Sequence, residues 1–326
     1  MPETTRNVRI AASSPDLELA GTWTLPENPS AVALLLPGAG PLDRDASGLG
    51  QRPFLHLAGQ LAQHGIATLR CDDRGVGESG GDYLAADEDV ILADARQQLQ
   101  WIKQEFPDLA LGIIGHAQGA LFAMRLAATS PDVHRLVLLS ANFRPGMTFM
   151  MEMREQLAGD TGLSGEELAA YMEHSRELFW AITEIDDARE REHKVREVIR
   201  ATVSHAEDID FQPDFQSVDQ YVEFAARDSL EWEIRTLLRS RPAEHLARLT
   251  CPVLALWGER DRHLDPEVEA TTFQETCEPP NKGEILPGMN HIFQLSDTGR
   301  IEDYPHDGPP MQPPLPERIA AWFSQA

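Results

Sequence analysis

The sequence has few cysteines, few basic residues and no long apolar run, and each shortage excludes a class of protein. Its three cysteines, Cys71, Cys251 and Cys277, are widely spaced and form no C-x-x-C pair, which argues against a disulfide framework and a zinc knuckle. No apolar run approaches the roughly 18 residues of a membrane span. Met1 to Ile10 is polar and lacks the apolar core of a signal peptide. We therefore expect a cytoplasmic protein with no membrane partner.

Positive charge is scarce, since 28 basic residues face 53 acidic ones and the formal net charge is -25. Such a surface repels nucleic acid, so we expect no nucleic-acid partner. The 326 residues, of which 42% are hydrophobic, are enough for one large domain with an inserted subdomain. A homodimer is compatible with this composition.

Short apolar runs alternate with amphipathic patterns in the first part of the chain. The expected elements are a hairpin over 8–26, strands at 31–36, 66–71, 109–114 and 136–140, and helices at 54–64, 89–106 and 118–129. Unbroken apolar strands are typical of a parallel sheet that is buried on both faces. Their alternation with helices indicates right-handed crossovers. The fold class is therefore predicted to be α/β, with a doubly wound, mostly parallel sheet.

The pattern changes after residue 141, where only helical segments follow. A capping box at Ser164-Gly165-Glu166-Glu167 opens one helix that runs to 183, and further helices are expected at 187–205, 217–228 and 230–240. Strands return at 252–257 and 284–286, before a closing helix at 316–324. We thus predict a sheet core at 1–141 and 250–326, interrupted by a helical cap at 142–249.

The segment Gly115-His116-Ala117-Gln118-Gly119 carries the chemical signal, because it lies between an expected strand and an expected helix. In the nucleophile elbow G-x-S-x-G, a tight strand-to-helix turn points the central side chain into a cleft. The flanking residues are glycines because a Cβ there would clash with neighbouring backbone. Both glycines are present here, but Ala117 stands where the serine is expected.

Asp261 and His291 follow Ala117 along the chain. Nucleophile position, acid and histidine occur in this same order in α/β-hydrolases. Asp261 follows the strand expected at 252–257, and His291 follows the next one. The histidine would take the proton of the nucleophile, and the aspartate would fix its tautomer. Glu259 and Asp265 are alternative acids. The backbone N–H groups of Ala39 and Gln118 are the expected oxyanion donors.

Four segments, found in this order along the chain, resemble the α/β-hydrolase superfamily and, more closely, its bacterial serine esterase and acyl-peptidase-like branch. They are Leu19-Ala-Gly-Thr-Trp-Thr-Leu-Pro26, Leu36-Pro-Gly-Ala-Gly-Pro-Leu-Asp-Arg-Asp45, Asp73-Arg-Gly-Val-Gly-Glu-Ser79 and Asn290-His-Ile-Phe-Gln294. The resemblance implies cleavage of a carboxylic ester or related acyl bond through an acyl-serine, without a cofactor. Pro37 departs from the histidine that is common before the oxyanion glycine, and Ala117 departs from the serine.

Alanine has no nucleophilic atom, so the chain as written should form no acyl-enzyme. The interpretation we favour is a serine hydrolase with its nucleophile replaced by Ala117, and hence an inactive variant. The alternative is a natural serine-free lyase, isomerase or cyclase in which the His291–Asp261 pair is the general base. A non-catalytic ligand-binding protein ranks below both, because it leaves that pair unexplained.

The expected substrate is a moderately large, apolar small molecule with an ester, lactone or thioester group. Candidates for its pocket are soft or aromatic side chains of the cap, although packing within the protein explains them equally well. They are Met147, Met150, Phe179 and Trp180.

The other polar residues near these motifs are expected to have structural roles. His116 is expected to pack or hydrogen-bond locally, His263 to lie on the surface, and Asp73-Arg74-Gly75 to form a turn. The remaining histidines show no spacing typical of metal ligands, so no metal site is predicted.

Overall fold

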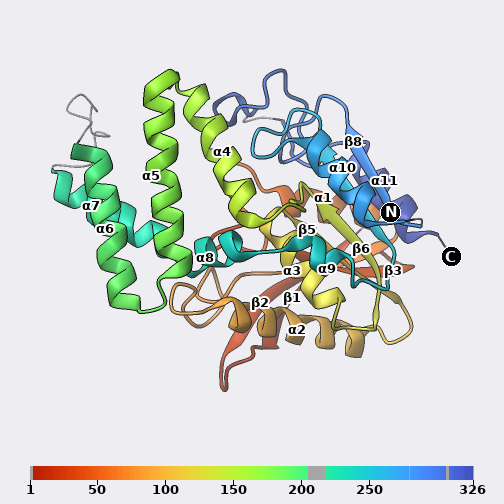
Figure 1. Ribbon diagram of the computed structural model, residues 1–326. Helices are drawn as coiled ribbons and strands as arrows, with labels where there is room; N and C mark the ends of the chain where they lie inside the picture. The colour runs from red at the N-terminus through yellow and green to blue at the C-terminus, as the bar shows by residue number, and fades with distance from the viewer. Residues whose placement is uncertain (1–2, 205–216, 279, 306–307, 326) are drawn as a thin grey trace. The chain divides into compact units, whose positions relative to one another are not determined.

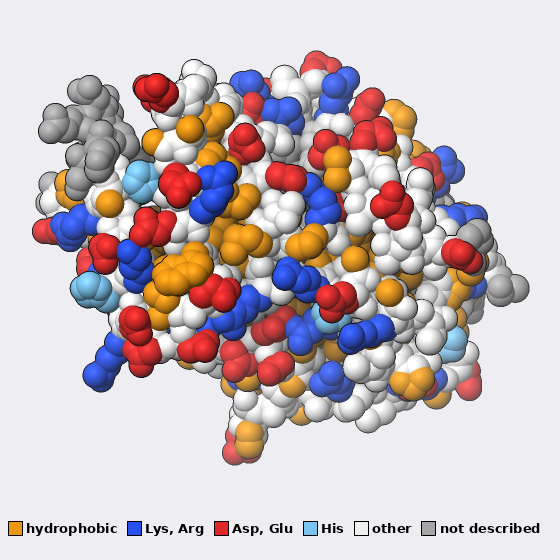
Figure 2. Space-filling view, viewed as in Figure 1, with side chains coloured by type: hydrophobic (Ala, Val, Ile, Leu, Met, Phe, Trp, Pro, Cys, Tyr) orange, Lys and Arg blue, Asp and Glu red, His pale blue; other side chains and the backbone are white. Residues whose placement is uncertain are grey.

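The computed structural model describes residues 3–204, 217–278, 280–305 and 308–325. The chain divides into two compact units, a sheet unit of Met1–Arg144 with Pro242–Ala326 and a helical unit of Pro145–Arg241. Among the described helices, none combines the length and the apolar character that crossing a membrane requires. On the face shown in Figure 2, acidic and basic side chains are interspersed.

The sheet unit contains an eight-stranded sheet in the order β1-β2-β4-β3-β5-β6-β7-β8 (Figure 1). Its strands are β1 (Thr4–Ala11), β2 (Glu18–Leu25), β3 (Ala31–Leu36), β4 (Ile66–Cys71), β5 (Ala110–His116), β6 (Val133–Leu139), β7 (Val253–Gly258) and β8 (Lys282–Leu286). Strand β2 pairs antiparallel with both β1 and β4, and all other pairs are parallel. The predicted α/β class with a mostly parallel sheet is confirmed.

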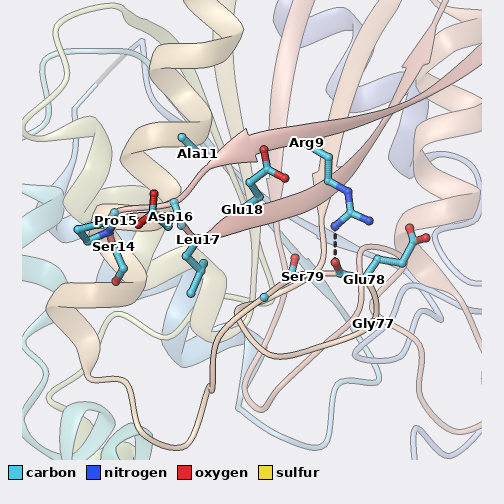
Figure 3. A pocket seen from close by; sticks show the side chains of 13 residues that line it. Arg9, Ala11, Ser14, Pro15, Asp16, Leu17, Glu18, Gly77, Glu78 and Ser79 are labelled. Carbon is cyan, nitrogen blue, oxygen red and sulfur yellow. Dashed lines mark hydrogen bonds between the residues drawn. The ribbon is translucent and has the colours of Figure 1, made fainter.

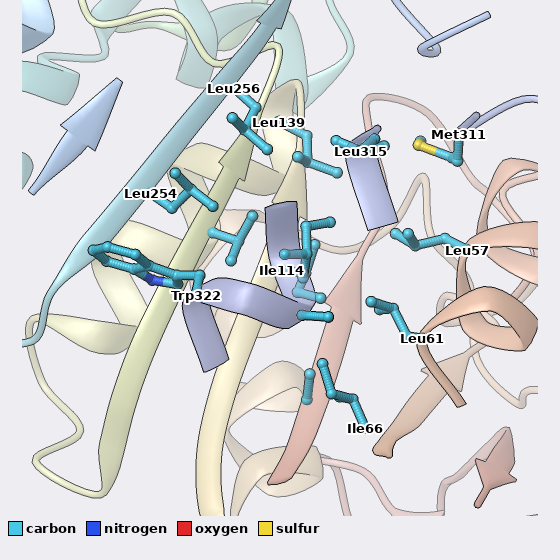
Figure 4. Packing of buried hydrophobic residues seen from close by; sticks show 14 of the residues in the cluster. Leu57, Leu61, Ile66, Ile114, Leu139, Leu254, Leu256, Met311, Leu315 and Trp322 are labelled. Atoms are coloured by element: carbon cyan, nitrogen blue, oxygen red, sulfur yellow. The ribbon is translucent and has the colours of Figure 1, made fainter. Parts of the chain in front are cut away.

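Helices cover the sheet because its central strands, such as β3 and β4, are buried on both faces. Helices α1 (Pro53–Gln63) and α11 (Leu315–Phe323) pack against strand residues such as Ile66, Ile114 and Leu256, which form one buried cluster (Figure 4). Helices α2 (Glu88–Glu105) and α3 (Gln118–Ala127) contact the strands without joining that cluster. Helices α9 (Pro242–Leu246) and α10 (Pro266–Thr276) and a short 3-10 helix, η1 (Ile301–Asp303), complete the described elements of this unit.

The helical unit has an apolar core of its own. It consists of α4 (Gly146–Asp160), α5 (Gly165–Glu184), α6 (Ala188–Ser204), α7 (Val218–Ser229) and α8 (Trp232–Arg239). Ser164 is the N-cap residue of α5, but its side chain makes no capping hydrogen bond. The predicted capping box is therefore wrong, and the positive φ of 57° at Gly165 changes the geometry that such a box requires.

The helical unit is shorter at both ends than the predicted cap at 142–249. On one side, the backbone N–H of Phe143 donates to Glu269 on α10 at 2.7 Å, and the Arg144 guanidinium pairs with the same carboxylate at 2.8 Å. On the other side, α9 contacts α3 and α10. These contacts place both flanking segments in the sheet unit, and hydrophobic periodicity alone does not reveal them.

Candidate active site

Ala117 occupies a strained turn between β5 and α3. Its backbone has φ 51° and ψ -116°, a left-handed conformation that residues with a Cβ rarely adopt. Hydrogen bonds hold it there, because its N–H donates to Leu139 at 2.9 Å and its carbonyl accepts from Ala120 at 3.0 Å. The geometry of a nucleophile elbow is thus present although the serine is not.

The glycines on both sides of Ala117 allow this turn to be compact. A Cβ on Gly115 would lie 2.4 Å from the carbonyl oxygen of Gly119. A Cβ on Gly119 would lie 2.2 Å from the carbonyl oxygen of Pro37. Both distances are far below van der Waals contact, so the predicted clash at the flanking positions is confirmed. The second one shows that the turn touches the loop that follows β3.

His291 and Asp261 form a hydrogen-bonded pair in the loops after β8 and β7. His291 Nδ1 donates to Asp261 Oδ2 at 2.7 Å, and Asp261 Oδ1 accepts the backbone N–H of His263 at 2.8 Å. Burial by itself would raise the pKa of Asp261, but the interactions with His291 and His263 lower it overall. The aspartate is therefore an ionised acceptor that fixes the His291 tautomer and leaves Nε2 with a free lone pair.

The two alternative acids are engaged elsewhere. Glu259 Oε2 accepts the backbone N–H of Gly288 at 2.8 Å. Asp265 caps α10 by accepting the N–H groups of Glu267 and Val268. Asp261 is consequently the acid that the structure pairs with the histidine.

Gly258 at the end of β7 brings the two loops together. A Cβ at this position would lie 2.3 Å from the carbonyl oxygen of Met289. The next loop residues continue the contact, since the N–H of Arg260 donates to that same oxygen at 2.7 Å. Sequence reasoning missed Gly258, although a glycine directly after an apolar strand is a signal of close backbone approach.

Two side chains hold the backbone of His291. Its carbonyl oxygen accepts a hydrogen bond from His116 Nε2 at 3.0 Å and another from Ser140 Oγ at 3.0 Å. Burial, followed by the proximity of His291, lowers the pKa of His116 to about 3, so the ring is neutral and its Nε2–H is the donor. Ser140, which has a φ of 47° just after β6, was missed, because its partner lies 151 residues away in sequence.

His263 lies beside His291 and only a third of its side chain is exposed. The two ring centroids are 4.2 Å apart at an interplanar angle of 35°. Burial and the neighbouring His291 lower the pKa of His263 to about 4. The prediction of a surface histidine is therefore wrong, because the turn that starts at Asp261 directs the chain back over the His291 ring.

The expected oxyanion donors lie at the start of α3 and in the loop after β3. Gln118 is the first residue of α3, so its N–H has no helical acceptor. Ala39 is exposed in the loop whose Gly38 would place a Cβ 3.6 Å from the Ala117 Cβ. The assignment of both donors stays a prediction.

The turn that begins at Asp73 supports this loop. The carboxylate of Asp73 accepts the N–H of Leu42 at 2.9 Å, and that of Asp72 accepts the N–H of Arg44 at 2.8 Å. Arg74 pairs with the buried Asp94 at 2.8 Å. These contacts give the predicted turn a structural role.

The four pocket candidates all lie in the helical unit. Met150 and Phe179 belong to its buried core, and Met147 packs against that core. Trp180 is 51% exposed. Their contact with a substrate stays a prediction.

A separate surface hollow of about 870 Å³ lies between the β1–β2 turn and the loop at 77–80 (Figure 3). Its edge is tied by a hydrogen bond from the Arg9 side chain to the carbonyl of Glu78. Its lining includes none of the candidate catalytic residues.

Comparison with known proteins finds similarity to one family model and to several solved structures. Residues 51–203 match the family model described as serine aminopeptidase, S33. An esterase of Pyrococcus furiosus is similar in structure, with a TM-score of 0.57 at 16% identity over 98% of this chain and 90% of that one. Est1E of Butyrivibrio proteoclasticus, solved with ferulic acid bound, gives a TM-score of 0.54 at 17% identity over 98% and 100%. A proline iminopeptidase of Mycobacterium smegmatis gives 0.55 at 15% identity over 98% and 97%. Likeness at such low identity is a likeness of fold.

Proposed function

Because the chain has the α/β-hydrolase fold, we propose that its site is built to hydrolyse a carboxylic ester, lactone or thioester of an apolar small molecule. The observation that carries this proposal is the 2.7 Å hydrogen bond between His291 and Asp261. The elbow residue His116 contacts the backbone of His291 directly. A carboxylate, an imidazole and a nucleophile position in this order are the parts of an acyl-transfer site.

With serine at position 117, each neighbouring group has a defined task. His291 Nε2 takes the hydroxyl proton as the oxygen attacks the acyl carbon, and then donates that proton to the leaving group. The N–H groups of Gln118 and Ala39 stabilise the oxyanion. Water, activated by the same histidine, then releases the acid and regenerates the serine.

The strained backbone of Ala117 supports the interpretation that the nucleophile is what is missing. A residue with a Cβ in such a conformation costs on the order of 1–3 kcal/mol. The surrounding glycines and hydrogen bonds nevertheless maintain the turn. A protein that only binds a ligand has no need of a turn that exposes one side chain. The chain with alanine is therefore proposed to be the inactive form of a hydrolase.

A second candidate function is serine-free acid–base chemistry, such as elimination, isomerisation or cyclisation. It is favoured by the completeness of the His291–Asp261 pair in a chain that has alanine at position 117. A neutral imidazole whose tautomer is fixed can remove a proton without any covalent step.

Ala117→Ser tests the first candidate. We expect this variant to react with a fluorophosphonate probe and to hydrolyse short aryl esters, while the unaltered chain does neither. Ala117→Ser combined with His291→Ala is the matched control, because it has the serine but lacks the base. Failure of the Ala117→Ser protein to label or to cleave any ester contradicts the proposal.

The second candidate predicts the opposite pattern. The unaltered chain would then convert a substrate, and His291→Ala alone would abolish that activity. If the unaltered chain converts nothing and serine restores ester cleavage, the second candidate fails.

A further inference from the structure

We propose that Asp261, His263 and His291 form a binding site for a divalent transition-metal ion such as Zn²⁺. Each residue offers one ligand atom, and these atoms lie within 4.8 Å of one another. The earlier prediction of no metal site depended on sequence spacing. Spacing along the sequence gives no sign of this group, because His291 lies 30 residues from Asp261 and meets it only in the folded chain.

The set of donors selects the class of ion. Two imidazole nitrogens and one carboxylate oxygen suit Zn²⁺, Co²⁺ and similar metals, and a fourth position stays open for water. Mg²⁺ and Ca²⁺ prefer oxygen ligands alone, so they fit poorly.

His263 supplies the donor that the hydrolytic mechanism does not use. Its Nδ1 is buried, has no hydrogen-bond partner among the described residues, and lies 3.8 Å from Asp261 Oδ1. A buried nitrogen without a partner loses its interaction with water and gains nothing in return. Coordination of a metal ion would satisfy it.

The three ligands are also held in place before any ion binds. The carboxylate of Asp261 accepts the backbone N–H of His263, and the carbonyl of His291 accepts two hydrogen bonds. The rings of the two histidines are tilted to one another with centroids 4.2 Å apart, and they restrict each other. The ligand atoms already lie within 4.8 Å of one another, so little conformational entropy is lost when an ion brings them to bonding distance.

Binding has a consequence for the acid–base pair. The ion takes the place of the proton between His291 Nδ1 and Asp261 Oδ2, and that proton moves through solvent to Nε2. A histidine that carries its proton on Nε2 has no lone pair there, so it cannot act as a base. The ion therefore switches off the base, and this inhibition, unlike the binding itself, rests on the proposed function.

Co²⁺ and Zn²⁺ alone are the probes, added to the unaltered chain. We expect one ion per chain by calorimetry, a Co²⁺ absorption band from nitrogen and oxygen ligands, and a higher Tm with Zn²⁺. His263→Phe keeps a ring that can contact His291 but removes the nitrogen, and it should weaken binding at least about tenfold. His56→Phe, on the exposed face of α1, is the matched control and should bind as the unaltered chain does.

Equal affinity in His263→Phe and His56→Phe, or several weak ions without a Co²⁺ band, overturns the proposal. Circular dichroism and the Tm without metal show whether His263→Phe is folded. If it is not, His263→Gln replaces it under the same criteria. Zn²⁺ should also inhibit ester cleavage by Ala117→Ser, and a chelator should restore it. Since binding is measured without turnover, failure of the metal site and failure of the proposed hydrolase are distinguishable.

Discussion

The sheet unit and the helical unit use their charged residues differently. In the sheet unit, Asp261 and Glu269 are buried and make defined hydrogen bonds. In the helical unit, ion pairs such as Arg176–Glu173 and Arg200–Asp219 lie between largely exposed side chains. Exposed pairs contribute about 0–1 kcal/mol each, whereas a buried charge that loses its partner costs several. The sheet unit is thus defined by specific polar geometry, and the helical unit by its apolar core and a solvated surface.

The largest expected contrast is in catalysis. In the Ala117→Ser background, Asp261→Asn should lower kcat by about 10⁴-fold, because the amide favours the wrong His291 tautomer. Asp186→Asn is the comparison in the helical unit, where the carboxylate is 91% exposed and pairs with Arg235. Esterase kinetics should show almost no change for it. Similar losses in both variants would remove Asp261 from its proposed role.

Replacing one glycine in each unit by alanine should change the stability of the protein in opposite directions. Gly119→Ala places a Cβ against the Pro37 carbonyl and should destabilise the protein by more than about 4 kcal/mol or prevent folding. A Cβ on Gly159, near the end of α4, meets no atom within 4 Å. Gly159→Ala should therefore stabilise by about 0.5–1 kcal/mol. Denaturant unfolding measures both. A Gly119→Ala protein of unchanged stability would show that the elbow is less compact than the 2.2 Å approach to Pro37 indicates.

Two neighbouring aromatic residues on α5, Phe179 and Trp180, test how burial contributes to the stability of the helical unit. Phe179 is 1% exposed, and its replacement by alanine should cost about 3–5 kcal/mol. Trp180 is 51% exposed, so Trp180→Ala should change stability by less than about 0.5 kcal/mol. If Trp180 contacts substrate, the Trp180→Ala substitution raises the KM of the Ala117→Ser enzyme and leaves its kcat unchanged. An unchanged KM across a series of apolar esters would remove Trp180 from the pocket candidates.

The smallest contrast is in pH dependence. The pKa of His116 is about 3 in the folded chain, below its ordinary value near 6.5, so only the unfolded chain binds the proton between these values. Stability should therefore fall by about 1.4 kcal/mol per pH unit from this residue as the pH decreases below 6.5. His116→Asn should reduce the slope of the profile measured by denaturant unfolding from pH 7 to 5, while the contribution of His263, whose pKa is also lowered, remains. His193→Asn, on the exposed side of α6, controls for the loss of a histidine. Parallel profiles for the unaltered chain and His116→Asn would contradict the assignment.

Prediction succeeded and failed in both units: the helix predicted at 217–228 lies within one residue of α7, whereas α10 of the sheet unit was not predicted as an element. The strands 31–36 and 66–71 are residue for residue those observed, because continuous apolar runs between turn residues leave little choice. Helix α4 was not predicted as an element, since the apolar residues of Gly146–Asp160 do not keep to one face. In the helical unit, packing against neighbouring helices decides what local periodicity leaves open.

By itself, the amino-acid sequence determined the strand–helix alternation, the glycines of the elbow, and the order of Ala117, Asp261 and His291. These features are local, since they depend on backbone sterics and on short-range periodicity. Only the tertiary structure decided that His116 and Ser140 hold the His291 carbonyl and that His263 lies against the His291 ring. Those contacts join the ends of separate strands, and no local pattern records them. The carboxyl ends of parallel strands meet at one edge of the sheet, which is why distant residues become one site there.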